Sequence, residues 1–389
     1  MSRVCSIFSQ LLQLFPRVEF ETAVKRHHAN RHARGFDCWT QFVAMLFCQL
    51  GQAHSLREIC GGLATSEGKL RHLGVGRAPK RSTLAYANEH RPWQLYETIF
   101  QQVLGRAQQL AAAHKRRFRF RNPLLSIDST IIDLSLSVHD WALYRREKGA
   151  AKLHLVLDHQ GYLPRYAVLT EGKCCDLTPV RPLDFPAGSV LIFDRGYQDY
   201  LWFERLTQRG VFFVTHLRRH AHVEVSRAHP LPDDGPILSD QTVRLGCQRY
   251  RMGSALRRIV VQDAGTSDPF VLLTNNFKLA ASTISRIYRE RWQIEVFFRA
   301  LKQNLRVKTF VGTSPNAVRI QIWTALIAVL LLKILQLRAR FAWSLANLVA
   351  LLRQQLFVHR CLWSWIDEPF QPPPTLDETP IEQLCLKIA

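Results

Sequence analysis

The chain has 389 residues, of which 47% are hydrophobic and 21% are charged, and this composition is typical of a globular protein and excludes wholesale disorder. A prior of about 150 residues per domain predicts two or three domains. Lys and Arg outnumber Asp and Glu by 52 to 31, and the resulting formal charge of +21 favours a polyanionic partner such as nucleic acid over a basic surface without a ligand.

The first third of the chain predicts helices. Apolar residues recur at helical spacing through residues 8–113, for example at Phe42, Leu46 and Leu50. Residues 1–122 contain 19 Lys or Arg and 7 Asp or Glu, a net charge of +12, which is more than half of the excess of the whole chain. We therefore expect residues 1–120 to form an all-helical domain that carries the nucleic-acid-binding face.

Two short helices are expected within this segment. Residues 55–63 predict a helix that is stopped by Gly61 and Gly62, and residues 79–88 predict another with Ser82 as its N-cap. Such a pair is compatible with a helix-turn-helix that reads a DNA major groove, in which Lys80 and Arg81 would contact DNA. The alternative is a small helical bundle with a basic surface, because short helix pairs are common in all-helical domains.

After the basic cluster at residues 115–121, the pattern changes from helical spacing to short β-rich runs separated by turn residues. The predicted strands cover residues 124–134, 153–157, 166–169, 190–193 and 211–214, and a helix is expected at 200–208. We interpret residues 121–214 as the first part of an α/β core with a mixed sheet and flanking helices.

The rest of the chain predicts an insertion, further helices and a tail. Residues 215–279 are basic and punctuated by Pro and Gly, with strand-like runs at 257–262 and 270–273, and predict a β-rich insertion. Within residues 280–360, helices are expected at 280–305, 317–340 and 343–357. The uncharged run at 320–332 is shorter than the roughly 20 residues of a membrane span and predicts a buried core helix, so no membrane partner is expected. We expect residues 361–389 to be a poorly ordered acidic tail with three prolines at 372–374.

Two aspartates lie where buried strands are predicted. Asp128 stands inside the run Leu-Leu-Ser-Ile-Asp-Ser-Thr-Ile-Ile, and Asp194 follows the run Val-Leu-Ile-Phe. A buried carboxylate needs a partner, and the carboxyl ends of strands in α/β sheets are where sites form. The alternative is structural, since an Asp at the end of a strand often caps the helix that follows.

A third carboxylate, Glu295, lies in a predicted helix. At about 100° per residue, one narrow polar stripe of this helix contains Tyr288, Arg291, Glu295 and Lys302. The apolar stripe next to it contains Ile287, Ile294, Phe298, Leu301 and Leu305. Packing of the apolar stripe on the sheet would place Glu295 at the margin of the core. The alternative is a solvated face with a weak ion pair between Arg291 and Glu295.

Three carboxylates that converge from two strands and a helix would repel one another unless cations occupied the site. Hard divalent ions such as Mg²⁺ prefer these oxygen ligands. Two such ions about 4 Å apart could activate a water or a 3′-hydroxyl and stabilise the leaving oxygen of an in-line phosphodiester displacement. With the basic surface, Asp128, Asp194 and Glu295 therefore predict metal-dependent chemistry on DNA.

The spacing Tyr288-x2-Arg291-x3-Glu295-x6-Lys302 resembles the YREK signature of the insertion-sequence-four family of bacterial DDE transposases. Asp128 within Ile-Asp-Ser-Thr resembles that family's first aspartate. Asp194 within Phe-Asp-Arg-Gly-Tyr resembles its second aspartate. The resemblance covers residues 1–360 and includes the helical stretch Gly-Phe-Asp-Cys-Trp-Thr-Gln-Phe-Val at 35–43.

The resemblance implies an RNase H-like fold with a β-rich insertion between the second Asp and the Glu, and the 101 residues from Asp194 to Glu295 leave room for one. It also implies Mg²⁺-dependent cleavage of transposon ends, with Mn²⁺ as an acceptable substitute, transfer of the freed 3′-hydroxyl into target DNA, and a homodimer on paired ends. The implied catalytic metal ligands are Asp128, Asp194 and Glu295. The implied DNA contacts near the cut are Tyr288, Arg291 and Lys302.

The sequence leaves two other functions open. A metal-dependent nuclease of the same fold would cleave without joining, and a transposase-derived protein that has lost catalysis would only bind terminal repeats. A zinc site at His216, His220, His222 and Cys247 is disfavoured, because no second Cys accompanies Cys247 and the histidines lie in a basic run.

The cysteines and the N-terminus indicate where the protein acts. Nine scattered cysteines without a CxxC pair are typical of reduced thiols, and the N-terminus lacks the continuous apolar run of a signal peptide. We expect a cytoplasmic, nucleoid-associated bacterial protein.

Overall fold

The computed structural model describes residues 5–31, 33, 35–66, 68–114, 117–120, 122–133, 150–218, 220–231, 235–247, 250–262, 269–304 and 310–371. In the first third of the chain these residues form helices joined by turns. They are α1 (Ile7–Leu12), α2 (Arg17–Arg26), α3 (Cys38–Leu50), α4 (Leu56–Ala64), the 3-10 helix η1 (Leu70–Leu73), α5 (Arg81–His90) and α6 (Gln94–Ala112). Their apolar faces share one buried cluster that includes Phe20, Phe42 and Tyr96. The helical pattern predicted for residues 8–113 is confirmed.

Two local predictions for this segment are wrong. α4 does not stop at Gly61 and Gly62 but runs through both. A Cβ on Gly62 would lie 2.9 Å from the Phe47 ring, so the absence of a side chain lets α4 approach α3 closely. Ser82 lies inside the first turn of α5. The N-cap residue is Lys80, which has an extended backbone and makes no capping hydrogen bond with its side chain.

Ten strands form one sheet. They are β1 (Leu124–Asp133), β2 (Ala150–Asp158), β3 (Leu163–Glu171), β4 (Val190–Phe193), β5 (Phe212–His216), β6 (His222–Ala228), β7 (Ile237–Cys247), β8 (Tyr250–Arg251), β9 (Leu256–Val261) and β10 (Phe270–Thr274). Their order is β3-β2-β1-β4-β5-β10-β9-β7-β6, with β8 beside β7. β4 runs parallel to β1 and to β5, and the other described pairs are antiparallel. The predicted mixed sheet is confirmed.

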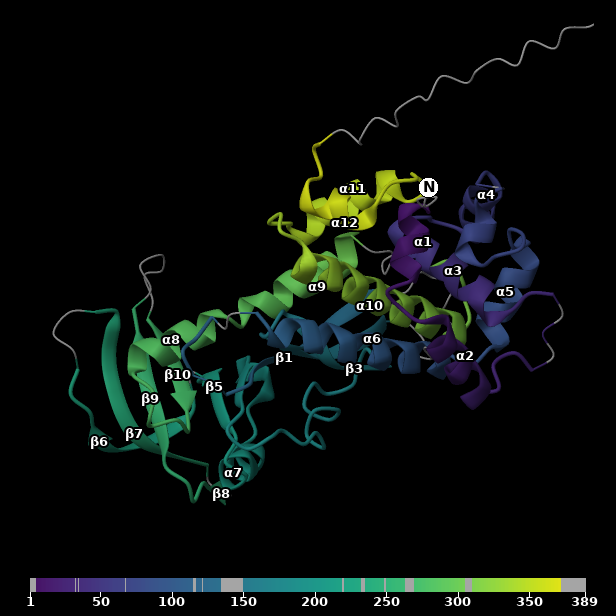
Figure 1. Cartoon of the computed structure of the whole chain (residues 1–389). Helices are drawn as coiled ribbons and strands as arrows, with labels where there is room; N and C mark the ends of the chain where they lie inside the picture. The colour runs from purple at the N-terminus through teal and green to yellow at the C-terminus, as the bar shows by residue number, and fades with distance from the viewer. Residues whose placement is uncertain are drawn as a thin grey trace, which may run out of the picture.

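The strands at 215–279 extend this sheet and do not form a sheet of their own. β10 pairs with β5, with Leu272 opposite His216, and β9, β7 and β6 follow outward (Figure 1). The sequence pattern missed β6 because its residues are mostly exposed and show no apolar alternation. The sequence pattern also missed β7. The pairing of β7 with β9 shifts register between Ile237 and Ser239, so this strand is irregular at its start.

Helices cover both faces of the central strands. On one face α7 (Tyr200–Gln208) packs on the sheet, with the Phe203 ring 4.5 Å from the Phe213 ring. On the other face lie α8 (Ala281–Arg289) and α9 (Trp292–Asn304), and Ile284 of α8 shares a buried cluster with Ile192 of β4. Each of the central strands is therefore buried on both sides, as an α/β core requires.

α10 (Pro315–Arg338) is, among the described helices, the one long and apolar enough to cross a membrane. Most of it is buried inside the protein, where it packs against α6 and α3 (Figure 1). The buried core helix predicted around residues 320–332 is confirmed.

The C-terminal prediction needs correction. After α11 (Leu345–Gln355), residues placed in the expected tail form α12 (Leu362–Asp367). Trp365 is buried, and the Ile366 carbonyl accepts a hydrogen bond from the Trp343 indole at 2.7 Å. Burial of apolar side chains thus orders the chain beyond residue 361. Residues 372–389 of the expected tail, which include its three prolines, lie outside the described residues.

Candidate active site

The sheet brings the two predicted aspartates to one level. In the parallel pairing of β1 with β4, Ile127 lies opposite Phe193, so Asp128 and Asp194 are the next residues on the two chains. β1 continues past this point, whereas β4 ends at Phe193. Both aspartates therefore lie level with the carboxyl end of β4, the edge at which sites form in α/β sheets.

Asp194 also has the structural role that the sequence left open. It is the N-cap residue of a 3-10 helix at Arg195–Tyr197, and its Oδ1 accepts a hydrogen bond from the Arg195 backbone N–H at 2.7 Å. This bond occupies one carboxylate oxygen and fixes the side chain. Because a carboxylate has further lone pairs, capping leaves it able to bind a second partner.

The helix that carries Glu295 is not continuous, contrary to prediction. α8 ends at Arg289 and α9 begins at Trp292, and between them Glu290 and Arg291 form a turn. The backbone N–H of Glu290 donates to Ile287 and that of Arg291 donates to Tyr288, which are the tighter bonds of a 3-10 turn. The apolar stripe is still buried at the positions described, which are Ile287, Ile294, Phe298 and Leu301. Leu305 lies outside the described residues.

Arg291 connects two of the three carboxylates. Its Nη2 lies 2.6 Å from Glu295 Oε1, and its Nη1 lies 3.6 Å from Asp128 Oδ2. The Arg291 side chain is 20% exposed and that of Asp128 is 22% exposed, so this group of charges is largely shielded from water. The intrahelical pair between Arg291 and Glu295 is present, but it belongs to a larger cluster that includes a strand residue.

Asp128 is the most strongly perturbed carboxylate of this group. The pKa of the Asp128 carboxyl is raised to about 6, chiefly by burial and in part by the negative charges of Glu295 and Asp194. A hydrogen bond from the Ser129 backbone and the Arg291 charge act in the opposite direction. A buried carboxyl that senses two other carboxylates is typical of a functional site.

The donor set fits a hard divalent cation in its chemistry, because it consists of carboxylate oxygens from three separate elements. The arrangement is not that of a formed metal centre: no group of three His, Cys, Asp or Glu side chains among the described residues is close enough to hold an ion. Instead, the Arg291 guanidinium supplies the positive charge between Asp128 and Glu295. If Asp128 and Glu295 are to ligate a cation, Arg291 must first withdraw from them.

The other predicted side chains lie at different distances from this cluster. Tyr288 precedes the turn, with its ring 6.4 Å from the rings of His216 and Phe270, and burial raises its pKa to about 12. Lys302 lies in the last turn of α9, about 10 Å along the helix axis from Glu295.

Lys80 and Arg81 belong to a different part of the molecule. They are exposed at the start of α5, which Figure 1 places well apart from α8 and the strand ends. The structure therefore does not bring this basic pair to the carboxylates.

A fourth carboxylate, Asp176, lies beside β1, although the sequence favoured only a turn or cap role for it. The Ser129 hydroxyl donates to Asp176 Oδ1 at 2.5 Å, and Lys152 Nζ lies 3.2 Å from the same oxygen. Ser129 follows Asp128 in the strand and so points to the opposite face of the sheet. Asp176 therefore lies across the sheet from Arg291.

A basic hollow adjoins Asp194. It has a volume of about 600 Å³ and is lined by residues from β5, β6, β7, β9 and β10. Arg195, Arg218 and Arg258 contribute cations, and Val223 and Phe270 contribute apolar surface. Arg195, which lines the hollow, is the residue that follows Asp194 in the chain.

Comparisons with known proteins identify the family to which the chain is similar. The family model described as "Transposase DDE domain" matches residues 119–331, and "Domain of unknown function (DUF4372)" matches residues 4–76. "Putative transposase y4zB" of Sinorhizobium fredii is 32% identical over 78% of this chain and 85% of its own length. "Probable transposase for insertion sequence element IS5377" of Geobacillus stearothermophilus is 30% identical over 65% of this chain and 66% of its own length.

Among solved structures, the piggyBac transposase in a synaptic complex with hairpin DNA matches with a TM-score of 0.42 at 10% identity. The match covers 95% of this chain and 81% of that chain.

Proposed function

Because the chain belongs to the transposase DDE domain family, we propose that it is a DNA transposase that binds transposon terminal repeats, cleaves the ends and transfers the freed 3′-hydroxyl into target DNA. The family model spans more than half of the chain, and the Sinorhizobium fredii relative is covered over most of its length. We also propose that β1 to β5 with their flanking helices are an RNase H-like core. The mixed sheet with helices on both faces supports this proposal.

The observation that carries the proposed chemistry is the cluster around Arg291. Asp128 and Glu295 both contact this guanidinium, and Asp194 lies level with Asp128 on the neighbouring chain. We propose that Asp128, Asp194 and Glu295 are the catalytic carboxylates. Bound to them, Mg²⁺ or Mn²⁺ would activate the attacking hydroxyl and stabilise the leaving oxygen.

The protein's own residues have separable roles in this proposal. Asp194 is held in place by its hydrogen bond to the backbone of Arg195, and Asp128 is held by the Ser129 backbone N–H at 2.8 Å. Arg291 neutralises Asp128 and Glu295 until DNA is bound. It then moves to the phosphate next to the cut, because a guanidinium matches phosphate oxygens as well as carboxylates.

DNA would follow the basic surfaces. The hollow with Arg195, Arg218 and Arg258 adjoins Asp194 and can hold phosphates near the cut, with Tyr288 and Lys302 as further contacts. We propose that residues 1–120 form the DNA-binding domain, with Lys80 and Arg81 on its DNA face. We further propose that residues 121–214 and 280–360 build the catalytic core around the 215–279 insertion, and that the protein acts in the bacterial cytoplasm as a homodimer on paired ends.

Strand cleavage and joining test this function together. Purified protein is incubated with labelled terminal repeats and a target plasmid, with Mg²⁺ or with EDTA. The proposal expects cleaved and joined products that require the metal and disappear in Asp128→Asn, Asp194→Asn and Glu295→Gln. Cleavage without any joined product would identify a nuclease instead. Repeats bound but never cleaved would identify a DNA-binding protein without catalysis.

A further inference from the structure

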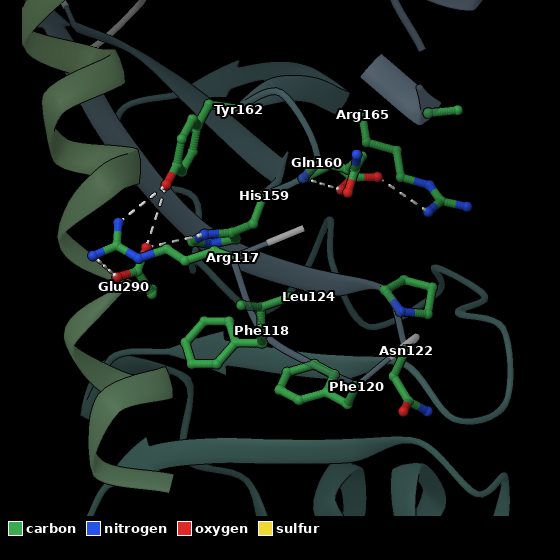
Figure 2. A pocket seen from close by; sticks show the side chains of 13 residues that line it. Arg117, Phe118, Phe120, Asn122, Leu124, His159, Gln160, Tyr162, Arg165 and Glu290 are labelled. Atoms are coloured by element: carbon green, nitrogen blue, oxygen red, sulfur yellow. Dashed lines mark hydrogen bonds and ion pairs between the residues drawn. The ribbon is translucent and has the colours of Figure 1, made fainter. Parts of the chain in front are cut away.

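A second pocket lies under the turn between α8 and α9, on the same face of the sheet as Asp128. It has a volume of about 170 Å³ and is lined by residues from the segment before β1, the turn from β2 to β3, and Glu290 (Figure 2). Leu124 lines the pocket, and Leu124, Ser126 and Asp128 alternate onto one face of β1. Among the described residues that line this pocket, none is a candidate catalytic carboxylate, so it is a neighbour of the candidate active site and not a part of it.

Three groups of the pocket surround the Glu290 carboxylate. Arg117 Nη2 lies 3.1 Å from its Oε1, and the Tyr162 hydroxyl donates to its Oε2 at 3.4 Å. His159 Nδ1 lies 3.9 Å from the same Oε2 and has no hydrogen-bond partner among the described residues. Figure 2 shows Arg117, Tyr162 and His159 directed toward Glu290. The Glu290 side chain, which is 7% exposed, is thus held by segments outside its own pair of helices.

The charge of Glu290 is balanced by Arg117. Burial lowers the pKa of His159 to about 4, so this ring is neutral near neutral pH and adds no positive charge. Within the part of the chain that the structure describes, Arg117 is therefore the cation that pairs with Glu290. A buried carboxylate that loses its cation is strongly destabilised and must reach water. Arg117 itself can leave the pair at little cost, because its side chain is 61% exposed.

The turn from β2 to β3 is shaped to present Tyr162 to Glu290. Tyr162 has a φ of 54°, in the left-handed region that residues with a bulky side chain rarely adopt. Its ring lies 5.6 Å from the His159 ring and 5.7 Å from Lys333 Nζ of α10. Strained backbone of this kind persists where surrounding contacts fix it, and it is concentrated at functional sites.

The turn that carries Glu290 has weak backbone bonds, whereas the helices on both sides are anchored. The backbone N–H groups that donate to the carbonyl three residues earlier, at 3.0 to 3.2 Å, are those of Glu290, Arg291, Gln293 and Ile294. A 3-10 stretch within a helix often marks a hinge. In α8, Ile284 is fully buried and the Arg286 guanidinium lies 5.6 Å from the Phe118 ring. In α9, Ile294 is fully buried. The turn can therefore change while both helices stay in place.

We propose that Glu290 is a positioning residue that keeps Arg291 on the candidate catalytic carboxylates until a DNA backbone phosphate takes Arg117 away from it. This inference rests on the proposed function. Arg291, the next residue in the chain, lies 3.6 Å from Asp128 Oδ2 and 2.6 Å from Glu295 Oε1. A guanidinium binds phosphate oxygens in the same bidentate way as a carboxylate, so DNA competes with Glu290 for Arg117. Glu290 without Arg117 moves toward water, and the turn carries Arg291 off the carboxylates.

Mn²⁺ binding to the full chain without DNA tests the hold on Arg291. The affinity is measured by electron paramagnetic resonance. Glu290→Gln removes a negative charge near the candidate site, and this loss of charge alone would weaken the binding of a cation. The proposal predicts the opposite result. Glu290→Gln should bind Mn²⁺ about 10-fold more tightly than wild type, since the apparent affinity rises with the fraction of molecules in which Arg291 has left the carboxylates.

Variants of Arg117 separate positioning from a general effect of charge. Arg117→Gln should also tighten Mn²⁺ binding, and Arg117→Lys, which keeps a cation beside Glu290, should return the affinity toward that of wild type. Arg165→Gln is the matched control. Arg165 is another arginine of the same pocket, 37% exposed and 3.7 Å from Asp158, and its loss should leave Mn²⁺ binding unchanged.

DNA binding tests the release of Glu290. The affinity of the full chain for duplex DNA is measured by fluorescence anisotropy in EDTA over a range of salt concentrations. Arg117→Gln should lower the salt slope by about 0.9, which is the contribution of one phosphate contact. Arg209→Gln should keep the wild-type slope, because this arginine is 52% exposed but pairs with Asp184 on the other face of the sheet.

The outcomes separate this inference from the proposed function. Unchanged Mn²⁺ affinity in Glu290→Gln and Arg117→Gln, equal tightening in Arg165→Gln, or an unchanged salt slope in Arg117→Gln would overturn the inference alone. Undiminished Mn²⁺ binding in Asp128→Asn in the same assay, or failure of wild-type protein to bind DNA, would overturn the proposed function and this inference with it.

Discussion

Glu290 and Arg291 are consecutive residues whose side chains serve two different clusters on one face of the sheet. Glu290 pairs with Arg117 from the segment before β1, and Arg291 contacts Asp128 within β1. The 3-10 turn between α8 and α9 therefore ties the pocket to the candidate carboxylates. A shift of this turn would change both clusters. The effect of individual buried charges on the free energy of unfolding can be measured separately.

The first prediction concerns Asp128 in metal-free protein. Its pKa is raised from 3.8 to about 6, so the folded state holds this proton more tightly than the unfolded state. The resulting stabilisation is complete below the unfolded pKa and is lost as the pH rises through about 6. Asp128→Asn should therefore be more stable than wild type by about 1–3 kcal/mol near neutral pH, with the difference vanishing in acid.

Urea unfolding in EDTA across this pH range measures the difference. Asp184→Asn is the control, because Asp184 is 85% exposed and pairs with Arg209 only at the surface. A destabilised Asp128→Asn variant at neutral pH would mean that the contact with Arg291 outweighs the cost of burial.

The second prediction concerns Lys333, on α10. Its Nζ lies 5.7 Å from the Tyr162 ring, and burial lowers its pKa from 10.5 to about 8. The folded state releases this proton more readily than the unfolded state, so stability should rise with pH between about 8 and 10.5. Lys333→Met should raise stability at neutral pH by about 1–3 kcal/mol and remove this rise. Thermal unfolding at neutral and alkaline pH measures both effects, and a less stable variant at neutral pH would contradict the argument.

The third prediction concerns the buried ion pair that joins β7 and β9. Arg257 Nε donates to Asp240 Oδ1 at 2.8 Å, and Arg257 Nη1 donates to the Leu279 carbonyl at 2.6 Å, just before α8. The two side chains are 10% and 5% exposed. Asp240→Ala should cost about 3–5 kcal/mol because it leaves a buried guanidinium unpaired. The double variant Asp240→Leu with Arg257→Met should lose less free energy of unfolding than Asp240→Ala, as measured by urea unfolding. A larger loss in the double variant would show that the pair itself stabilises the sheet.

The fourth prediction concerns Lys80 and Arg81. Charge reversal of both residues should weaken binding to terminal repeats and flatten its salt dependence, by a slope of about 0.9 for each phosphate that is no longer neutralised. The fold should tolerate the change, because acidic residues at a helix N-terminus are favourable. Reversal of the exposed pair Lys25 and Arg26 is the matched control. Equal weakening of DNA binding in both variants would mean that Lys80 and Arg81 act only through the net charge of the protein and do not contact DNA specifically.

The sequence predicted those parts of the site that depend on local pattern. Asp128 and Asp194 were found because each interrupts or ends a buried apolar run, and Glu295 was found from helical spacing. The break at Glu290 was not predictable, since its partners Arg117 and Tyr162 come from distant segments.

Long-range pairing explains the other misses. The extension of the sheet by β10 depends on which strand meets β5, and the apolar runs do not specify that partner. Exposed β6 has no apolar alternation to detect. The pocket beside Glu290 and His159 combines three segments of the chain, so neither its volume nor the unpartnered His159 nitrogen has a sequence signal.

The central claim is that Asp128, Asp194 and Glu295 act together as ligands of one divalent metal centre. Electron paramagnetic resonance of Mn²⁺ titrated into the protein with bound DNA measures this directly. The claim predicts that Asp128→Asn, Asp194→Asn and Glu295→Gln each weaken Mn²⁺ binding by at least about 10-fold, a loss that even changes next to a metal ligand can cause. Asp184→Asn, at an exposed carboxylate that pairs with Arg209, should leave binding unchanged. Undiminished Mn²⁺ binding in the three variants, or an equal loss in Asp184→Asn, would contradict it.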